Sequence, residues 1–234
     1  MTKRHDGRSN LDVRKLQAKA GVIKKADGSA YFKIGNTAAY AAVYGPRELH
    51  PKFMQNPRTG ILRCSYNMLP FSTTERNRPG PSRRSKELSL VTQKALLPVV
   101  DLSEYPNAVV DVFIELSETD AGSRCAGICA AAIALADAGI TMKDLVPAVS
   151  VGLINNELVV DLDGEEEHMN ENETPDVPIA MIPSTGEYTL LQMDGIMTKD
   201  QVLEALTLVK PALQEILKVQ KQALKDRFSE GEQK

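Results

Sequence analysis

The sequence contains few of the residues on which disulfide-bonded or zinc-binding proteins depend. Its 234 residues include only three cysteines and no tryptophan, and 5% of the residues are aromatic. Cys64, Cys125 and Cys129 are odd in number and have no paired CxxC spacing, which argues against a disulfide framework or a zinc site. Sparse cysteines fit a reducing compartment, so we predict that the protein is cytoplasmic.

Long apolar runs and common catalytic motifs are also missing. No stretch is apolar for long enough to span a bilayer, and the charged segment at residues 1–8 lacks the apolar core of a secretory signal. There is no P-loop, no GxGxxG and no Ser-His-Asp or Cys-His signature. The composition, 42% hydrophobic and 25% charged with a net charge of -3, is typical of a soluble globular protein. Any nucleic-acid binding must therefore be local to a patch or channel.

Basic residues are concentrated between Arg76 and Lys86, a segment with five basic side chains and no acidic one. Its centre, Pro79-Gly80-Pro81, can continue neither a helix nor a strand ladder, which predicts a loop. Clustered arginines suit phosphate because each guanidinium can pair two oxygens at once. The alternative is a solvated loop that improves solubility.

Acidic residues are concentrated between Asp161 and Asp176, where eight carboxylates occur without any Lys or Arg. A solvated and partly mobile loop is one interpretation of this acidic tract. The other is a carboxylate cluster that serves a chemistry needing a divalent cation. Together with the basic segment, the second interpretation suggests phosphoryl transfer.

The hydrophobic pattern predicts an α+β protein whose strands pair locally through hairpins. The expected strands are residues 18–23, 30–34, 38–44, 61–69, 108–116, 146–153, 158–162, 177–182 and 188–193. The expected helices are residues 85–100, 123–138 and 199–228, the last kinked by Pro211. We assign residues 1–14 to a polar N-terminal arm, 15–228 to a single domain, and 229–234 to a polar tail. The similar strand-then-helix order of the two halves hints at an internal duplication.

Gly122-Ser123-Arg124, at a strand-to-helix junction, is a candidate anion site. Free backbone N–H groups and the helix dipole attract anions at such a junction, and glycine lets a ligand approach the backbone closely. An ordinary N-cap at Ser123 is the commoner explanation of this pattern. Arg124 favours the anion site, because a positive side chain in a first helical turn opposes the dipole unless an anion is bound.

Other candidates have equally plain alternatives. Arg83 and Arg84, just before the expected helix at Ser85, either contact phosphate or form a solvated pair. Asp176 either ends a loop or acts as a general acid or Mg²⁺ ligand. On the strand of residues 61–69, Arg63 alternates away from the core face, whereas Tyr66 is either a core residue or a platform for a stacked base.

Several short motifs, taken together and in order, resemble the RNase PH family over residues 6–228. They are Asp6-Gly7-Arg8, Gly21-Val22, Ala26-Asp27-Gly28-Ser29-Ala30, Ala42-Val43-Tyr44-Gly45-Pro46-Arg47-Glu48, Tyr66-Asn67-Met68-Leu69-Pro70-Phe71-Ser72, Pro79-Gly80-Pro81-Ser82-Arg83-Arg84, Asp120-Ala121-Gly122-Ser123-Arg124-Cys125-Ala126-Gly127, Ala134-Leu135-Ala136-Asp137-Ala138-Gly139-Ile140 and Leu190-Leu191-Gln192-Met193-Asp194-Gly195. Within the family the chain is most similar to the catalytic RNase PH-type subunit of the archaeal exosome.

The resemblance implies the RNase PH-like fold (ribosomal protein S5 domain 2-like), a duplicated β-α unit with mixed sheets and flanking helices. It also implies a hexameric ring with a paralogous non-catalytic RNase PH-type subunit, capped by RNA-binding subunits. The implied activity is phosphorolytic 3′-to-5′ RNA degradation that releases nucleoside diphosphates, and its reverse adds RNA tails. Inorganic phosphate is then the co-substrate and Mg²⁺ or Mn²⁺ the expected metal.

Site residues carry over where the motifs match. The resemblance assigns phosphate binding to Gly122, Ser123, Arg124 and Arg84. It assigns RNA binding to a further set of residues: Arg63, Tyr66, Arg83 and Arg84. Asp176 matches the family's catalytic aspartate before the strand that reads Val-Pro-Ile, and a catalytic and metal-binding role is implied for it.

The family's second catalytic aspartate has no direct match, because Asn170 stands six residues before Asp176. The tract is about three residues longer than usual, and this insertion shifts the role to Glu167, with Glu166 or His168 as its neighbours. A non-catalytic, RNA-guiding ring subunit is the alternative function, and a free-standing tRNA-trimming homohexamer fits the motifs less well.

Overall fold

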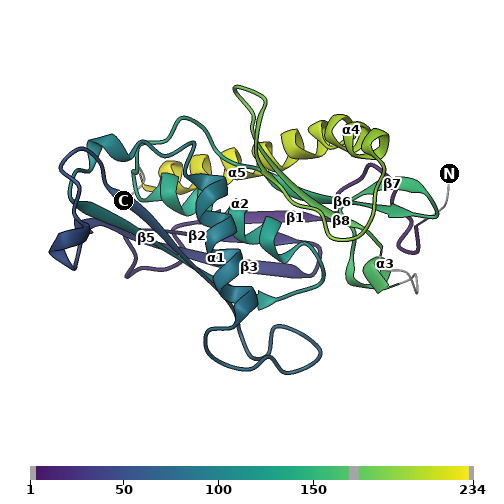
Figure 1. The fold of residues 1–234 in the computed structure, drawn as a ribbon, viewed down its shortest axis with the longest axis horizontal. Helices are drawn as coiled ribbons and strands as arrows, with labels where there is room; N and C mark the ends of the chain where they lie inside the picture. The colour runs from purple at the N-terminus through teal and green to yellow at the C-terminus, as the bar shows by residue number, and fades with distance from the viewer. Residues whose placement is uncertain (1–3, 169–173, 232–234) are drawn as a thin grey trace.

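The computed structural model describes residues 4–168 and 174–231 and has two β-sheets with helices packed between and around them (Figure 1). The strands are β1 (Leu16–Ala20), β2 (Gly28–Ile34), β3 (Thr37–Glu48), β4 (Ile61–Met68), β5 (Ala108–Glu118), β6 (Ala148–Ile154), β7 (Glu157–Val160), β8 (Asp176–Ile182) and β9 (Glu187–Leu191). The α-helices are α1 (Arg83–Leu96), α2 (Ser123–Asp137), α3 (Gly164–His168), α4 (Lys199–Leu208) and α5 (Lys210–Gly231). Two 3₁₀ turns span Lys52–Met54 and Leu102–Glu104.

The first sheet has five strands in the order β1-β2-β3-β5-β4. β1, β2 and β3 form an antiparallel meander, as the turn residues predict. The expectation that all strands pair through hairpins is wrong for β4, which runs parallel to β5 in register from Ile61 beside Val109. Parallel neighbours need a crossover, and α1 supplies it between β4 and β5.

The second sheet has four antiparallel strands in the order β7-β6-β8-β9. The Ala-rich helix α2 packs against strands of both sheets and is buried along almost its whole length. Small side chains suit this position, because a helix that is covered on all sides needs no polar face. The α+β class predicted from the sequence is therefore confirmed.

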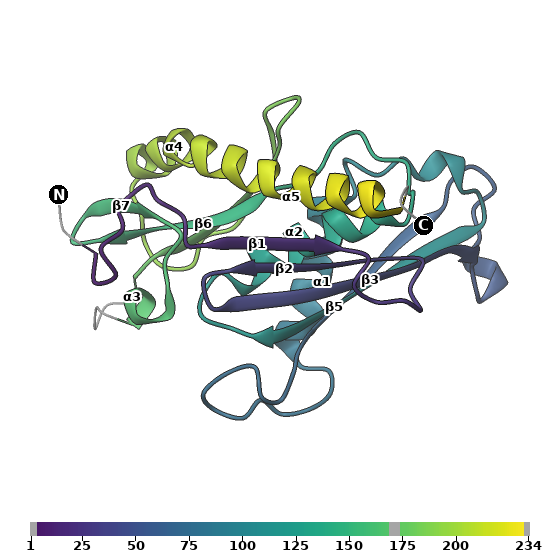
Figure 2. The ribbon, with the colours of Figure 1, turned by 180° about the vertical axis from the view of Figure 1, so that it is seen from behind.

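Helices α1 and α2 cover one face of the five-stranded sheet, and α5 runs along β1 (Figure 2). The opposite face carries exposed aromatic side chains, among them Tyr40 and Phe113. None of the helices in the described residues is both long and apolar enough to cross a membrane. Cys64, Cys125 and Cys129 are buried free thiols.

The expected C-terminal helix is divided into two helices rather than kinked. α4 is capped at its C-terminus by Val209, and α5 begins at Lys210. Pro211 is the second residue of α5, where its missing N–H removes no hydrogen bond because the first turn of a helix has no partner for it. α5 continues to Gly231, beyond the predicted start of the tail at residue 229.

Candidate active site

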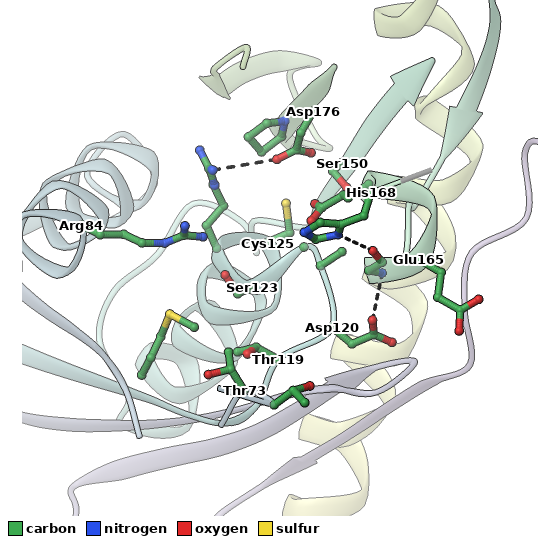
Figure 3. Close-up of a pocket in the computed structure, with 18 of the residues that line it drawn as sticks. Thr73, Arg84, Thr119, Asp120, Ser123, Cys125, Ser150, Glu165, His168 and Asp176 are labelled. Atoms are coloured by element: carbon green, nitrogen blue, oxygen red, sulfur yellow. Dashed lines mark hydrogen bonds and ion pairs between the residues drawn. The ribbon is translucent and has the colours of Figure 1, made fainter. Parts of the chain in front are cut away.

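A cavity of about 700 Å³ opens where the two sheets meet the start of α2 (Figure 3). Its wall combines the loop before α1, the N-terminus of α2, helix α3 and the start of β8. Among the lining residues are Arg84, Gly122, Ser123, Arg124, Glu167 and Asp176. The structure thus brings six of the residues named from the sequence to one cavity, although they are up to 92 positions apart (84 to 176).

The N-terminus of α2 is shaped by two successive left-handed residues. Ala121 has φ 57° and Gly122 has φ 62°, a conformation that residues with a Cβ seldom adopt. The hydroxyl of Thr37 holds this turn, since it accepts the N–H of Asp120 at 2.8 Å and donates to the carbonyl of Ala121 at 2.6 Å. The sequence analysis did not identify Thr37, which lies more than 80 positions from the turn.

The N-cap of α2 is Gly122, so the interpretation of Ser123 as an ordinary N-cap is wrong. No side chain caps this helix, which leaves the N–H groups of its first turn available to a ligand. A Cβ at position 122 would also come within 3.3 Å of the Arg14 guanidinium. The turn therefore presents backbone donors to the cavity, and its positive φ at Gly122 disfavours any residue with a Cβ there.

Two arginines add positive charge to this side of the cavity. Arg124 donates to the side-chain oxygen of Gln192 at 2.9 Å, and its other terminal nitrogen lies 3.8 Å from Asp176 Oδ2. Arg84 is the second residue of α1, which starts two residues earlier than the sequence predicts. Arg83 and Arg84 are exposed in the first turn of α1, where their positive charges oppose the helix dipole. This arrangement favours the binding of an anion beside them.

Asp176 and Glu167 face the cavity from β8 and α3. Burial raises the pKa of Asp176, and the negative charge of Asp194 raises it further, while Arg124 and the neighbouring Ser150 act in the opposite direction. Oδ1 of Asp176 is buried and has no hydrogen-bond partner among the described residues. Burial, followed by the charge of Asp176, likewise raises the pKa of Glu167. Both carboxylates are destabilised as anions, which is typical of functional acids.

The neighbours of Glu167 have different orientations. Glu166 is 1% exposed and bonds to Arg4 on the far side of α3, so it does not line the cavity. His168 lines the cavity, and its ring Nδ1 lies 2.6 Å from the carbonyl oxygen of Gly164. Asn170, the position of the missing family aspartate, lies outside the described residues.

Tyr66 does not have the environment of a base-stacking platform. Its side chain is buried, and its ring lies against α2 so closely that a Cβ at Gly127 would approach it to 3.3 Å. Burial raises the pKa of the Tyr66 hydroxyl to about 12. Of the two alternatives for Tyr66, the structure shows the core residue, because its side chain lies on the buried face of β4. Its contact with RNA remains a prediction that rests on the family resemblance.

Arg63 and Arg83 are exposed but lie outside the set of residues that line the cavity. Arg63 projects from the open face of β4 and forms a two-pronged ion pair with Asp111, at 2.5 and 2.9 Å. Asp111 lies directly beside Arg63 in the parallel register of β4 and β5. Both arginines remain RNA-binding predictions.

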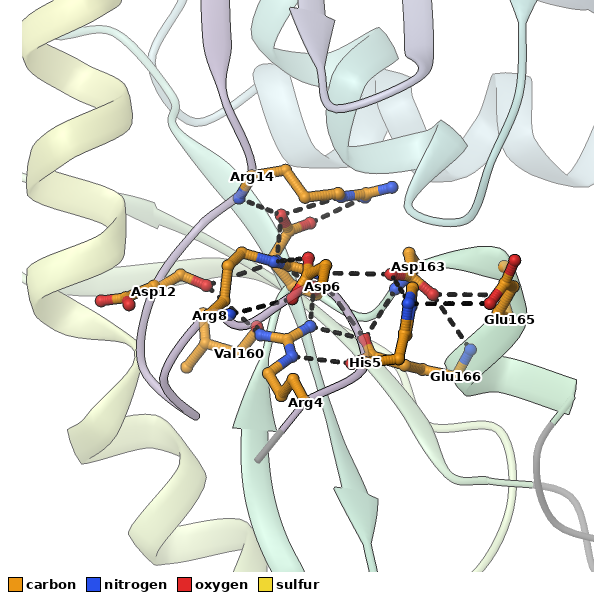
Figure 4. A network of polar contacts seen from close by, with 12 residues as sticks. Arg4, His5, Asp6, Arg8, Asp12, Arg14, Val160, Asp163, Glu165 and Glu166 are labelled. Carbon is orange, nitrogen blue, oxygen red and sulfur yellow. Dashed lines mark hydrogen bonds and ion pairs between the residues drawn. The ribbon is translucent and has the colours of Figure 1, made fainter. Parts of the chain in front are cut away.

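Three carboxylates of the acidic tract neither line the cavity nor belong to a solvated loop. Asp161, Asp163 and Glu166 form ion pairs with side chains of the N-terminal arm (Figure 4). Arg14 contacts Asp161 through Nε at 2.9 Å and a terminal nitrogen at 2.8 Å. The described part of the tract is thus divided between this structural set and the carboxylates that line the cavity, which are Glu165, Glu167 and Asp176.

An anion-binding turn, two arginines and two raised-pKa carboxylates around one cavity define a site suited to phosphoryl-transfer chemistry. Comparison with known proteins identifies the class. The models of the 3′ exoribonuclease family match this sequence with domain 1 over residues 12–141 and domain 2 over residues 144–209. The chain therefore belongs to the 3′ exoribonuclease (RNase PH) family.

Individual relatives match along nearly the whole chain. The exosome complex component Rrp41 of Thermococcus kodakarensis is 50% identical over 226 residues, covering 97% of this chain and 90% of that protein. Rrp41 of Methanopyrus kandleri is 48% identical over 225 residues, covering 96% and 93%.

Two solved structures share the fold. Rice (Oryza sativa) Rrp46 superposes with a TM-score of 0.84 at 22% identity, covering 95% of this chain and 100% of that one. A chain of the Archaeoglobus fulgidus exosome with RNA bound to the active site superposes with a TM-score of 0.79 at 23% identity, covering 92% and 91%. The predicted RNase PH-like fold is confirmed.

Proposed function

We propose that this chain is the catalytic RNase PH-type subunit of an exosome-type ring and degrades RNA from its 3′ end with inorganic phosphate. The observation that carries the proposal is the convergence of the anion-binding turn, Arg84 and Asp176 on one cavity. The similarity to archaeal Rrp41 proteins over nearly the whole chain supports the same function.

Phosphate binding is the first step that the geometry suits. The free N–H groups at the start of α2 and the guanidinium of Arg84 would hold inorganic phosphate against the repulsion of the RNA backbone. One phosphate oxygen then attacks the last phosphodiester phosphorus in line with the leaving 3′-oxygen. In such displacements, positioning of the reactants and neutralisation of their charge account for most of the rate enhancement by the enzyme.

Bond breaking releases the 3′-oxygen of the preceding nucleotide and a nucleoside diphosphate. The leaving oxygen takes up a proton, and Asp176 is the residue that we assign to supply it. Its raised pKa keeps a larger share of the carboxyl protonated than in an ordinary aspartate. Run in reverse, a terminal 3′-hydroxyl attacks a nucleoside diphosphate, phosphate leaves, and the RNA is extended.

A Mg²⁺ or Mn²⁺ ion fits Glu167 and Asp176, two of the carboxylates that line the cavity. Hard cations prefer carboxylate oxygens, and Asp176 Oδ1 is a buried oxygen without a hydrogen-bond partner among the described residues. We assign Asp176 and Glu167 as the residues that would hold the ion, and Asp176 supplies the proton only in the state in which it is protonated and not bound to the ion. When bound, such an ion neutralises phosphate charge.

RNA outside the cavity is assigned to exposed basic residues. Arg63 and Arg83 are solvent-accessible and suit contacts with backbone phosphates, while Arg76 and Arg78 supply general electrostatic attraction. The proposed partners are a paralogous non-catalytic subunit that alternates with this chain in a hexameric ring, and RNA-binding cap subunits. The three buried free thiols suit a cytoplasmic location.

The test is release of nucleoside diphosphates from poly(A) by the ring reconstituted with its partner subunit, in the presence of phosphate and Mg²⁺. Release of monophosphates, or decay that does not depend on phosphate, would refute the mechanism. An Asp176→Ala ring separates this function from that of a non-catalytic, RNA-guiding subunit. A catalytic subunit loses activity on this change, whereas a ring whose activity resides elsewhere is unaffected.

A further inference from the structure

Helix α3 carries Glu167 into the cavity but is only five residues long, Gly164–His168. A helix of this length is not stable by itself, because the cost of forming its first turn exceeds what so few hydrogen bonds return. Contacts from outside the helix must therefore set its position and its rotation about its own axis. The described ion pairs of its side chains are with the N-terminal arm (Figure 4), while Asp120 and Thr174 each form one hydrogen bond with its backbone.

Arg4 forms a two-pronged clamp on Glu166, the residue before Glu167. Its Nε donates to Oε1 at 2.7 Å and one terminal nitrogen to Oε2 at 2.5 Å. The Arg4 and Glu166 side chains are 2% and 1% exposed, so the pair is shielded from water. Without water to compete for the hydrogen bonds, the ion pair is strong and tolerates little change in the relative position of the two side chains.

The other end of the clamp is anchored in the second sheet. Arg4 also donates to the carbonyl of Val160, the last residue of β7, at 2.9 Å and to that of Asp161 at 2.7 Å. The guanidinium therefore links α3 to a strand end. Because the guanidinium is planar and rigid, it fixes the Glu166 carboxylate relative to the end of β7.

Adjacent residues of an α-helix point about 100° apart around its axis. With Glu166 held against the arm, Glu167 must point to a different side of α3, and that side is the cavity wall. Glu167 and Asp176 then line the same cavity, from α3 and from β8.

We propose that Arg4 is a positioning residue of the active site, which holds Glu166 so that Glu167 faces Asp176 across the cavity. The proposal rests on the phosphorolytic function proposed above and extends it to the N-terminal arm. Arg4 touches no reacting atom and acts through α3. Asp163 assists by accepting the N–H groups of Glu165 and Glu166 at 3.1 and 3.0 Å.

The experiment compares two changes in the arm within the reconstituted ring. Arg4→Met keeps a long side chain but removes the fork, and we expect kcat for nucleoside diphosphate release to fall about 10- to 100-fold with RNA affinity unchanged. Asn10→Ala is the matched control, because Asn10 joins the arm to Glu157 of β7 at 3.0 Å. We expect less than about a twofold change in that variant.

A double-mutant cycle distinguishes positioning from general destabilisation. In a Glu167→Gln ring, adding Arg4→Met should lower kcat no further, because the group that it positions is already gone. Additive losses, or an Arg4→Met ring as active as wild type, would overturn the proposal. An inactive wild-type ring would instead refute the proposed function. If Arg4→Met does not fold, Glu166→Gln breaks the fork from the other side at almost equal volume, and the same criteria apply to it.

Discussion

Two sets of carboxylates from the same acidic tract occupy opposite environments. Asp161 and Glu166 are each 1% exposed and bound by arginines of the N-terminal arm. Glu167 and Asp176 are partly buried, and the positive charges near them do not offset the effect of burial on their pKa. Asp161 and Glu166 stabilise the fold only while their arginine partners are in place. Glu167 and Asp176 have raised pKa values, which suit proton transfer but lower the stability of the fold when the groups are ionised.

The comparison shows that acidic composition does not distinguish structural from functional carboxylates. The geometry of the partners does, because the charge of a carboxylate enclosed by a guanidinium fork is already neutralised by that fixed partner. Asp163 illustrates the structural set: burial raises its pKa, but the N–H of Glu166 and the side chain of His5 lower it below its usual range.

Asp176→Asn should have the largest effect. Removing the carboxyl that faces the cavity is expected to lower phosphorolysis by about 10²- to 10⁴-fold. Because the pKa of Asp176 is raised in the fold, its ionised form opposes folding at neutral pH, and the neutral amide removes that cost. We therefore expect the melting temperature of this variant to stay equal or rise. A loss of stability together with the loss of activity would place Asp176 in the structural set.

Asp161→Asn should have the opposite outcome. The change removes the buried carboxylate that pairs with Arg14 and leaves it the 3.9 Å contact to Asp120, so we expect a loss of about 3 kcal/mol in the free energy of unfolding measured in urea. Asparagine tolerates the positive φ of 57° at this position, so backbone strain does not confuse the result. Glu118→Gln, at the exposed pair with Lys33, is the control and should cost less than about 1 kcal/mol. Equal costs at the two sites would contradict the structural assignment.

Arg84→Gln and Arg83→Gln extend the comparison to the neighbouring arginines of α1. Arg84 lines the cavity and Arg83 does not. Loss of a charge-assisted hydrogen bond should raise the KM for phosphate about 10-fold in Arg84→Gln, with less than about a threefold change in Arg83→Gln. Steady-state kinetics at saturating RNA measures the difference. Equal effects would show that only the net charge of the segment matters.

The smallest effect concerns His5, whose ring Nε2 lies 2.8 Å from Asp163 Oδ2. The hydrogen bond to Asp163 raises the pKa of His5 above 6.5. A raised pKa of this sign stabilises the fold fully below the unfolded-state value, and the contribution is lost as pH rises through the folded-state value. Melting temperatures between about pH 6 and 8 should therefore decline more in wild type than in His5→Gln. Parallel pH profiles would show that His5 does not hold the arm.

Much of the fold could be predicted from local patterns. Alternation placed β4 within one residue of its observed end at Met68, and the Ala-rich run predicted α2. The pairing of β4 could not be predicted, because parallel and antiparallel neighbours share the same alternation. Pro211 marks the place where the C-terminal helix is disturbed, but a proline is compatible both with a kinked helix and with two helices, so the end of α4 at Val209 could not be predicted.

The site divides in the same way. The motifs of the sequence were sufficient to name the phosphate turn, Arg84 and Asp176 as candidates, because glycine, arginine and carboxylate have specific chemistry wherever they lie. They could not show that Gly122 rather than Ser123 caps α2, or that Tyr66 is enclosed by the core. Those outcomes depend on what packs opposite each residue.

By itself, the amino-acid sequence determined the class of fold, the chemical groups available to the site and the family. Only the tertiary structure decided which carboxylates of the acidic tract face the cavity and which are held by the arm. The physical reason is that the fate of a charge depends on its partners, and Arg4 and Glu166 are 162 positions apart in the chain but 2.7 Å apart between Nε and Oε1 in the fold.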